Sequence, residues 1–405
     1  MTTAWVESTI GAEFDVQLGK RVDAAVARGV PKTCINNRGV RWGRIDVAEA
    51  ATELLSKTDL RDLRLRYGDL LVCEGGEIGR ASVWRDELPE AYYLNTLHRL
   101  RSKGRYQADI IAALLERWAA TGELQALVGK SSLAHLTKEN LLRVPLPMPS
   151  PEEQERISEA LRTTDELVRA LERLIAKKRD IKQGMMQELL TGGTRLPGYT
   201  GEWRELPVSE LLEFKNGLNK ASEYFGRGTP IVNFMDVMRA PVITSDRVKG
   251  LVSLNRNEVS RFSARRGDMF FTRTSESVDE IGTAAVLVDD VPSAVFSGFV
   301  LRGRPIASVN TTFLAYQFQL SSIRRQVIAT ASYTTRALTN GGSLGRVRVG
   351  VPSLEEQAAL VSVVADVDAE LAALERRLES ARALKTGMMQ ELLTGRTRLP
   401  LEAAS

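Results

Sequence analysis

The sequence predicts an α/β (α+β) fold in which two globular regions are separated by two long antiparallel helices that form a coiled coil. Three observations predict it. A segment of 49 residues occurs twice at a constant offset of 203 residues, each copy carries a helical apolar repeat, and the regions before the two copies share a fainter pattern. The chain has 405 residues, enough for two or three domains. The two halves are therefore predicted to be related by a pseudo-twofold internal duplication.

The repeat is strongest in segment 149–197, which returns as segment 352–400 with 25 identities in 49 positions and no gap. Both copies open on Pro-Ser-x-Glu-Glu-Gln. The nine residues Gly-Met-Met-Gln-Glu-Leu-Leu-Thr-Gly are identical at 184–192 and 387–395. An ungapped match of this length indicates that part of the chain was duplicated.

Each copy is predicted to be one long helix. It starts with a serine and two acidic residues, and Gly192 or Gly395 ends it. In the second copy the apolar residues recur at alternating steps of four and three, the period of a coiled-coil seam, and Lys385 is the one break. In the first copy three polar residues occupy the seam: Thr164, Lys178 and Lys182. A helix of about 40 residues reaches roughly 60 Å, so we expect each helix to be the other's partner rather than to pack only on its own half.

The regions before the two helices resemble each other faintly. Gly68-Asp69 and Gly267-Asp268 are each followed by an apolar run, which predicts a turn that leads into a buried strand. Helical stretches from Ile110 to Val128 and from Thr312 to Ile328 follow, and each ends in a polar loop. The predicted domains are two globular regions, 1–148 and 198–351, a central helix, 149–197, and a C-terminal helix, 352–400.

Composition narrows the function only slightly. The net charge of +4 and the pI of about 9.0 allow a polyanion as partner without requiring one. The two cysteines and two histidines lie too far apart in sequence to suggest a zinc site or a disulfide framework, so we expect no cofactor. No signal peptide is recognised, and no apolar run approaches the roughly 20 residues that span a bilayer, so a cytoplasmic protein is expected.

The ends of the first helix resemble a known family. The run Pro-Leu-Pro-Met-Pro-Ser-Pro-Glu-Glu-Gln at 145–154, and Met-Met-Gln-Glu-Leu-Leu-Thr-Gly followed by Thr-Arg-Leu-Pro-Gly-Tyr-Thr-Gly-Glu-Trp within 185–203, are similar to the specificity (S) subunits of type I restriction-modification enzymes. The resemblance covers essentially the whole chain. It implies two target recognition domains, each of which reads one part of an asymmetric, bipartite site on double-stranded DNA. The helices would set the spacing between the two parts.

The resemblance also implies partners. Two modification (methyltransferase) subunits would carry out adenine methylation, and restriction (helicase-nuclease) subunits would perform ATP-dependent cleavage. The chain itself has no Asn/Asp-Pro-Pro-aromatic tetrad, and Gly129-Lys130-Ser131 lacks the spacing of a phosphate-binding loop. We therefore expect a non-catalytic DNA-recognition subunit. Residues 20–50 match the family's first domain only loosely.

Candidate DNA contacts are polar side chains on projecting loops, because such groups can bond to phosphates and base edges. The candidates in the first half are Arg38, Arg41, Arg44, Lys130, Ser131 and Ser132. The candidates in the second half are Arg273, Thr274, Ser275, Tyr333, Thr334, Thr335 and Arg336. The loop 330–336 is the strongest candidate because hydroxyls, an aromatic ring and an arginine occur together there.

The identical motif near the helix ends is a candidate partner surface, through Met185, Met186, Met388 and Met389. The alternative is that these methionines pack the ends of the coiled coil. Two other functions remain open at this point: a coiled-coil adaptor that displays two protein-binding heads without DNA recognition, and a nuclease that uses carboxylates.

Overall fold

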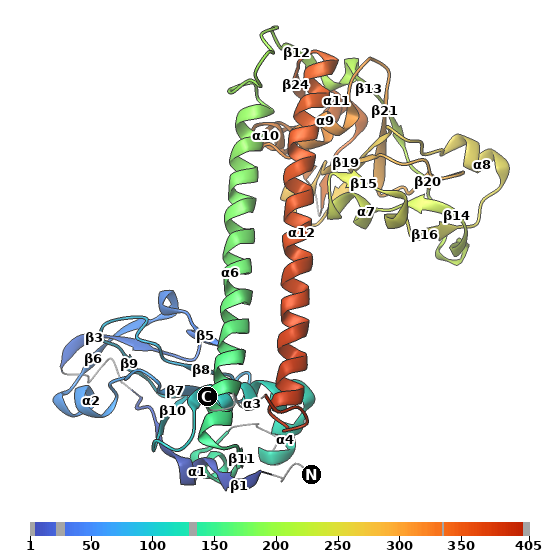
Figure 1. The fold of residues 1–405 in the computed structure, drawn as a ribbon. Helices are drawn as coiled ribbons and strands as arrows, with labels where there is room; N and C mark the ends of the chain where they lie inside the picture. Colours follow the sequence, from blue (N-terminus) through green and yellow to red (C-terminus); the bar gives the residue numbers. More distant parts are fainter. Residues whose placement is uncertain (1–4, 22–28, 129–135, 334–335, 400–405) are drawn as a thin grey trace, which may run out of the picture. The chain divides into compact units, whose positions relative to one another are not determined.

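The computed structural model describes residues 5–21, 29–128, 136–333 and 336–399. The chain divides into two compact units, which we call unit 1 (Met1–Leu174 with Leu374–Ser405) and unit 2 (Ile175–Ala373). The division runs through both long helices, so each unit contains a part of each helix (Figure 1).

The two long helices are α6 (Pro151–Leu189) and α12 (Leu354–Leu392). The hydroxyl of Ser150 accepts the amide hydrogen of Glu153 at 3.2 Å, and Ser353 caps α12 in the same way. Beyond the helix ends, Gly192 and Gly395 have positive φ angles of 77° and 68°, a conformation that favours glycine. The predicted helices and their start and stop signals are confirmed.

The two helices pair within each unit. In unit 1, Arg382 contacts Glu172 at 2.6 Å, and in unit 2, Lys178 contacts Glu370 at 2.8 Å. Residue numbers on one helix rise as those on the other fall, so the pairing is antiparallel. Buried seam residues are Ile157, Leu161, Leu171, Ala381 and Leu392 in unit 1, and Ile175, Leu189, Leu360, Val364 and Leu371 in unit 2. The predicted antiparallel coiled coil is confirmed.

The predicted break in the seam has a structural role. Lys385 lies 2.7 Å from Glu116 of α3 (Ala108–Thr121) and 2.8 Å from Asp165 of α6. At the matching place in unit 2, Lys182 lies 2.5 Å from Asp368. A lysine and an aspartate therefore pair across the helices in both units.

Unit 1 is built on a four-stranded sheet of order β2-β10-β7-β8, and α3 packs against this sheet. Unit 1 also contains a smaller sheet of order β6-β3-β9. Strand β1 pairs with β11, the segment that leads into α6. Its remaining elements are β1 (Val6–Thr9), α1 (Ile10–Glu13), β2 (Phe14–Leu18), β3 (Val30–Ile35), β4 (Val40–Arg41), β5 (Arg44–Ile45), η1 (Val47–Glu49), β6 (Ala51–Leu55), α2 (Lys57–Asp62), β7 (Leu70–Cys73), β8 (Ala81–Val83), β9 (Tyr92–Tyr93), β10 (Leu97–Ser102), α4 (Glu123–Val128), α5 (Lys138–Arg143) and β11 (Pro145–Met148).

Unit 2 contains a five-stranded sheet of order β13-β21-β17-β19-β15 and three-stranded sheets of order β16-β14-β20 and β18-β23-β22. Strand β12 pairs with β24, as β1 pairs with β11 in unit 1. Its elements are β12 (Arg204–Pro207), η2 (Val208–Glu210), β13 (Leu212–Asn216), η3 (Ser222–Tyr224), β14 (Phe225–Val232), α7 (Phe234–Arg239), β15 (Val242–Ile243), η4 (Ser245–Arg247), β16 (Gly250–Val252), α8 (Arg256–Arg261), β17 (Met269–Thr272), β18 (Thr274–Ser275), η5 (Val278–Glu280), β19 (Ala284–Leu287), β20 (Val295–Phe296), β21 (Val300–Pro305), α9 (Thr311–Gln317), α10 (Ser321–Ala329), β22 (Ser332–Tyr333), β23 (Ala337–Leu338), α11 (Gly341–Gly345) and β24 (Arg348–Val351).

The predicted buried strands after the Gly-Asp pairs are β7 and β17, and every residue of both is buried. The two predicted helical stretches are each interrupted. Gly122, with φ 77°, separates α3 from α4, and an extended residue, Leu320, separates α9 from α10. A left-handed or extended residue cannot continue an α-helix, so each stretch becomes two helices.

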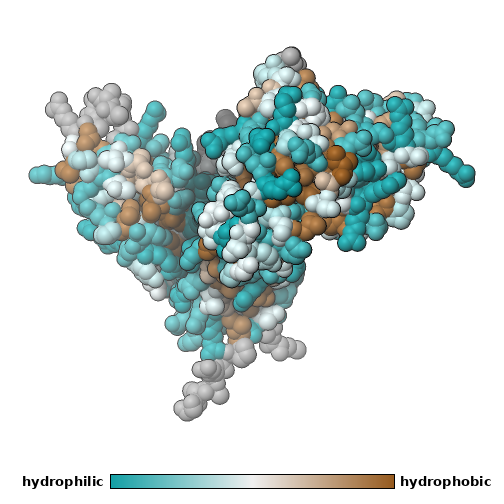
Figure 2. All heavy atoms as spheres, turned by 90° about the horizontal axis from the view of Figure 1, so that it is seen from above, coloured by the Kyte–Doolittle hydropathy of each residue, from teal (hydrophilic) through white to brown (hydrophobic). Residues whose placement is uncertain are grey.

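The surface visible in Figure 2 is mostly hydrophilic, with smaller apolar areas among the charged side chains. Within the described ranges, no helix is both long enough and apolar enough to cross a membrane.

Candidate nucleic-acid interface

Two candidate loops of unit 2, far apart in sequence, lie in one small sheet. Its strand order is β18-β23-β22. Thr274 pairs with Leu338, and Tyr333 pairs with Ala337. The fold therefore brings together two segments that were proposed independently from the sequence. The segment 332–333 had been predicted as loop, but it forms the short outer strand β22 of this ribbon.

Tyr333 and Arg336 are the largest exposed side chains among the described residues of this ribbon, and both are accessible to a ligand. Tyr333 is 63% exposed. The side chain of Arg336 is 58% exposed and contacts Glu276 at 3.1 Å, whose own side chain is 84% exposed. An exposed ion pair of this kind contributes about 0.2–1 kcal/mol. Arg336 can therefore exchange Glu276 for a phosphate or a base at little cost in free energy.

The other candidates of unit 2 differ in access. Arg273 and Thr274 are half-buried. Ser275 is buried, and its hydroxyl donates to the Glu280 carboxylate at 2.5 Å while it accepts the amide of Ser277. Ser275 therefore stabilises its own loop in the free chain. Thr334 and Thr335 lie outside the described residues.

In unit 1 the exposed candidates lie on a short hairpin, in which β4 pairs with β5, and in the turn just before it. Arg38, Arg41 and Arg44 are all exposed. The indole of Trp42 donates a hydrogen bond to Glu77 at 2.6 Å, which attaches the hairpin to the loop after β7. Lys130, Ser131 and Ser132 lie outside the described residues.

In each unit, the loop that follows the buried strand β7 or β17 forms a backbone hydrogen bond to a segment far along the chain. In unit 1 the amide of Leu136 donates to the carbonyl of Glu74 at 2.8 Å. In unit 2 the amide of Thr339 donates to the carbonyl of Arg273 at 3.0 Å. We call this place the loop junction. Its backbone bond is shared, but an acidic residue in unit 1 stands where unit 2 has a basic one.

One titratable side chain at the unit 1 junction, His98, is buried. The ring of His98 bonds through Nε2 to the carbonyl of Leu136 at 2.8 Å, and burial lowers the pKa of this histidine. Cys34 and Cys73 are also buried, and burial raises the pKa of the Cys34 thiol to about 12. His135 lies outside the described residues. In the part of the chain that the structure describes, no three His, Cys, Asp or Glu residues gather where they could hold a metal ion.

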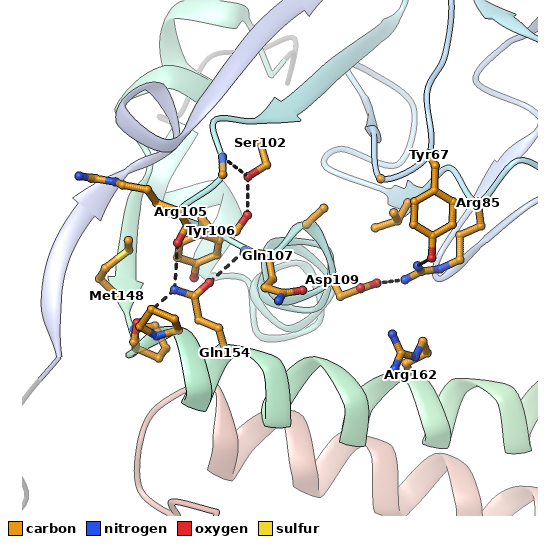
Figure 3. A pocket seen from close by; sticks show the side chains of 16 residues that line it. Tyr67, Arg85, Ser102, Arg105, Tyr106, Gln107, Asp109, Met148, Gln154 and Arg162 are labelled. Atoms are coloured by element: carbon orange, nitrogen blue, oxygen red, sulfur yellow. Dashed lines mark hydrogen bonds and ion pairs between the residues drawn. The ribbon is translucent and has the colours of Figure 1, made fainter.

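A cavity of about 790 Å³ lies in unit 1 at the start of α6 (Figure 3). Its polar side chains bond mainly to one another. Arg85 contacts both Asp109 and the hydroxyl of Tyr67. The amide oxygen of Gln154 accepts the amide hydrogen of Gln107 at 3.0 Å. The bond to Gln154 holds the start of α3 against the start of α6, and the bond from Arg85 to Asp109 holds the start of α3 to the segment after β8. We therefore assign the wall of this cavity to the framework of unit 1.

The candidate methionines lie mostly inside. Met186 and Met389 are buried in the cores of unit 2 and unit 1, and Met185 and Met388 are partly buried beside them. This arrangement supports the packing role for the motif. The large apolar side chains exposed on these helix segments are Ile181, at 51%, and Leu384, at 57%. Sequence reasoning missed this pair, although both are apolar residues outside the seam at equivalent positions of the repeat.

Comparison with known proteins connects this fold to a family. Residues 50–181 match the model of the type I restriction modification DNA specificity domain. The chain is 20% identical over 283 residues to the type I restriction enzyme MjaVIII specificity subunit of Methanocaldococcus jannaschii, with 66% of each chain covered. It is 22% identical over 316 residues to the EcoKI specificity subunit of Escherichia coli, with 69% of this chain and 67% of the relative covered. The chain thus spans about two thirds of the length of these relatives.

Solved structures show the same fold. The type I restriction-modification S subunit from M. genitalium is 15% identical, with 96% of both chains covered and a TM-score of 0.59. A chain from a structure of type I system assembly and conformational transition is 18% identical, with 98% of this chain and 99% of that chain covered and the same TM-score. Residues 50–181 thus match a type I restriction modification DNA specificity domain, and the chain is similar in sequence to curated specificity subunits of type I restriction enzymes.

Proposed function

We propose that this chain recognises a bipartite, asymmetric DNA site and directs the adenine methylation and ATP-dependent cleavage that partner subunits perform. The observation that carries the proposal is the loop junction, which has one backbone arrangement in both units but unlike side chains. Two identical readers would select a palindrome, whereas two unlike readers select two different half-sites. The target recognition domains are 1–148 and 198–351, and the helices at 149–197 and 352–400 join them.

The accessible arginines give this proposal its chemistry. Arg336 in unit 2 and Arg38, Arg41 and Arg44 in unit 1 are exposed. A guanidinium can donate two parallel bonds to a guanine edge or to a phosphate, and a tyrosine hydroxyl such as that of Tyr333 can add a third bond. In this proposal the phosphate contacts set the position of each unit on DNA, and the base contacts choose the sequence.

Salt dependence of binding tests the proposal. The full chain, co-expressed with the methyltransferase subunit of its system, is titrated against a duplex of random sequence at 50 and 200 mM salt. If about four phosphates are neutralised, affinity falls about a hundredfold between these salt concentrations. Absence of DNA binding at both concentrations would contradict the proposal and support the alternative, a coiled-coil adaptor that displays two protein-binding heads.

We further propose that two methyltransferase subunits dock on equivalent helix surfaces, and that restriction subunits join the complex through them. Each surface consists of an exposed apolar residue and a glycine three residues later: Ile181 with Gly184, and Leu384 with Gly387. A β-carbon at either glycine would contact nothing, so packing in this chain does not require glycine. Glycine inside a helix costs about 1 kcal/mol relative to alanine. A partner that approaches the helix backbone closely at these positions would explain why glycine is present despite this cost.

The docking surfaces are tested by co-purification. The variants Ile181→Glu and Leu384→Glu should each reduce the recovered methyltransferase from two copies towards one, and the double variant should lose both. Ala176→Glu is the matched control, because Ala176 is exposed on α6 and the second copy already has Glu379 at this position. Full recovery with the double variant would remove these surfaces from the complex.

A further inference from the structure

Phe299 of unit 2 is a large apolar side chain with no core to pack into. It lies between β20 and β21 and is 63% exposed, although Phe296 and Val300 on either side are fully buried. Isolated exposed apolar residues are common on protein surfaces, so the position of Phe299 must carry the argument. Its carbonyl accepts the amide hydrogen of Arg273 at 3.1 Å, which places it directly at the loop junction.

The sheet β18-β23-β22, which we call the ribbon, begins next to Phe299. Arg273 precedes β18, and the strands β18, β23 and β22 are neighbours, each about 4.8 Å from the next. Phe299 therefore lies at the base of an antiparallel ribbon that carries Tyr333 and Arg336. Within this three-stranded sheet, the antiparallel pair β22–β23 is a ribbon of the kind that fits the major groove of B-DNA, where every base pair presents a distinct set of groups.

Unit 1 has the same backbone position with a different side chain. The carbonyl of Thr96 accepts the amide hydrogen of Glu74 at 2.9 Å, as the carbonyl of Phe299 accepts that of Arg273. Thr96 is half-buried and has a positive φ angle of 70°. The large exposed ring is therefore particular to unit 2, as expected of a residue that distinguishes one half-site from the other.

We propose that Phe299 determines specificity by contacting the C5-methyl group of a thymine in the half-site that unit 2 reads. This inference rests on the proposed function. The ring cannot donate or accept a conventional hydrogen bond, so it can select a base only through apolar contact. In the major groove, the thymine methyl is the apolar group among the donors and acceptors of the base edges. Burial of one such group corresponds to about a fourfold change in affinity.

The test removes the methyl group and the ring separately. Bound duplexes are first selected from a random pool with the full chain and its methyltransferase subunits, which defines the two half-sites. Thymines are then replaced one at a time by deoxyuridine, which lacks only the C5-methyl group. One replacement, in one half-site, should weaken binding by the wild type about fourfold. Phe299→Ala and Phe299→Thr should bind the two probes equally.

The matched control is Phe225→Ala, which removes another exposed phenylalanine of unit 2 and should keep the discrimination between thymine and uracil. Unchanged preference at the other positions of the half-site that unit 2 reads shows that unit 2 of each variant is folded. The proposal is overturned if the half-site lacks thymine, if the wild type ignores every methyl group, or if Phe299→Ala still discriminates. A pool without any enriched sequence would instead reject the proposed function itself, and Phe299 with it.

Discussion

Unit 1 and unit 2 share several bonds at the ends of the long helices and differ in the side chains at the loop junction. Arg398 contacts Glu153 at 3.1 Å in unit 1, and Arg195 contacts Glu356 at 2.6 Å in unit 2. Each arginine also lies over a tryptophan ring, that of Trp5 or of Trp203, at 5.5 and 5.7 Å. The repeated Glu-Arg pair thus ties the start of one long helix to the segment after the other within each unit.

A second duplicated bond lies beside the first. The side chain of Gln154 accepts the amide hydrogen of Gln107, and that of Gln357 accepts the amide hydrogen of Asn310 at 2.8 Å. At the loop junction, by contrast, only the backbone bond is repeated. Side chains without a framework partner can change at little cost in stability. The comparison therefore explains how a duplicated chain can keep one framework and acquire two surfaces.

The largest predicted effect concerns the seam lysines, which are equivalent in sequence but not in surroundings. Lys385 contacts two carboxylates, and together these raise its pKa above the ordinary value even though burial acts in the opposite direction. Lys385→Met leaves both carboxylates without a cation and should destabilise unit 1 by about 3 kcal/mol. Lys182→Met removes one contact to the half-exposed Asp368 and should cost about 1 kcal/mol.

Hydrogen exchange measured peptide by peptide distinguishes the two variants. Lys385→Met should speed exchange in α3, whereas Lys182→Met should change α9 only slightly. If the two variants lost protection from hydrogen exchange equally, the additional contact between Lys385 and Glu116 would contribute nothing to stability.

A smaller effect is expected at the ribbon. Arg336→Ala should weaken binding to one half-site by about 2 kcal/mol and leave the preference for the other half-site intact. The measurement is competition binding with duplexes altered in one half-site at a time. A uniform loss on all sequences would identify a phosphate contact, and an unchanged affinity would exclude Arg336 from the interface.

The smallest predicted effect is a pH dependence of stability that unit 1 has through Glu13 and unit 2 lacks at the matching position. The hydrogen bond from Arg105, opposed by burial and assisted by Ser8, lowers the pKa of Glu13 below its ordinary value of 4.5. Leu211 occupies the matching position in unit 2, four residues after the first strand. A lowered carboxyl pKa stabilises the fold above the ordinary value, and this stabilisation is lost as the pH falls through the lowered pKa.

Glu13→Gln should therefore lower the free energy of unfolding of unit 1 by about 1 kcal/mol at pH 7, and the difference from wild type should shrink below pH 4.5. Tryptophan fluorescence during urea unfolding measures this, because Trp5, Trp42, Trp84 and Trp118 belong to unit 1 and only Trp203 to unit 2. A difference that grows on acidification would show that the sign of the pKa shift is wrong.

The long helices were predictable from sequence because the spacing of their apolar residues and their capping residues are local signals. The duplication provided each signal twice. The 3.5-residue period indicated the coiled coil, and the serine caps and terminal glycines marked its ends. Lys385 looked like a defect in the seam because its partner Glu116 is distant in sequence. The breaks in the shorter helices were missed because a single residue, Gly122 or Leu320, decides each of them.

The candidate site was predictable only as separate segments. Composition identified the segments around Arg273 and Tyr333, but their pairing in one sheet depends on strand order, which periodicity does not reveal. Ser275 and Thr274 looked equivalent, although only Ser275 is turned inward to Glu280. The sequence carries no signal that Phe299 is exposed, because its neighbours Phe296 and Val300 are core residues.

The central claim is that a duplicated framework carries two unlike DNA readers. Selection of bound duplexes from a random pool, with the full chain and its methyltransferase subunits, tests it most directly. The account predicts two specified segments of unlike sequence, separated by an unspecified spacer of constant length. A palindrome, a single continuous motif or a spacer of variable length would contradict it.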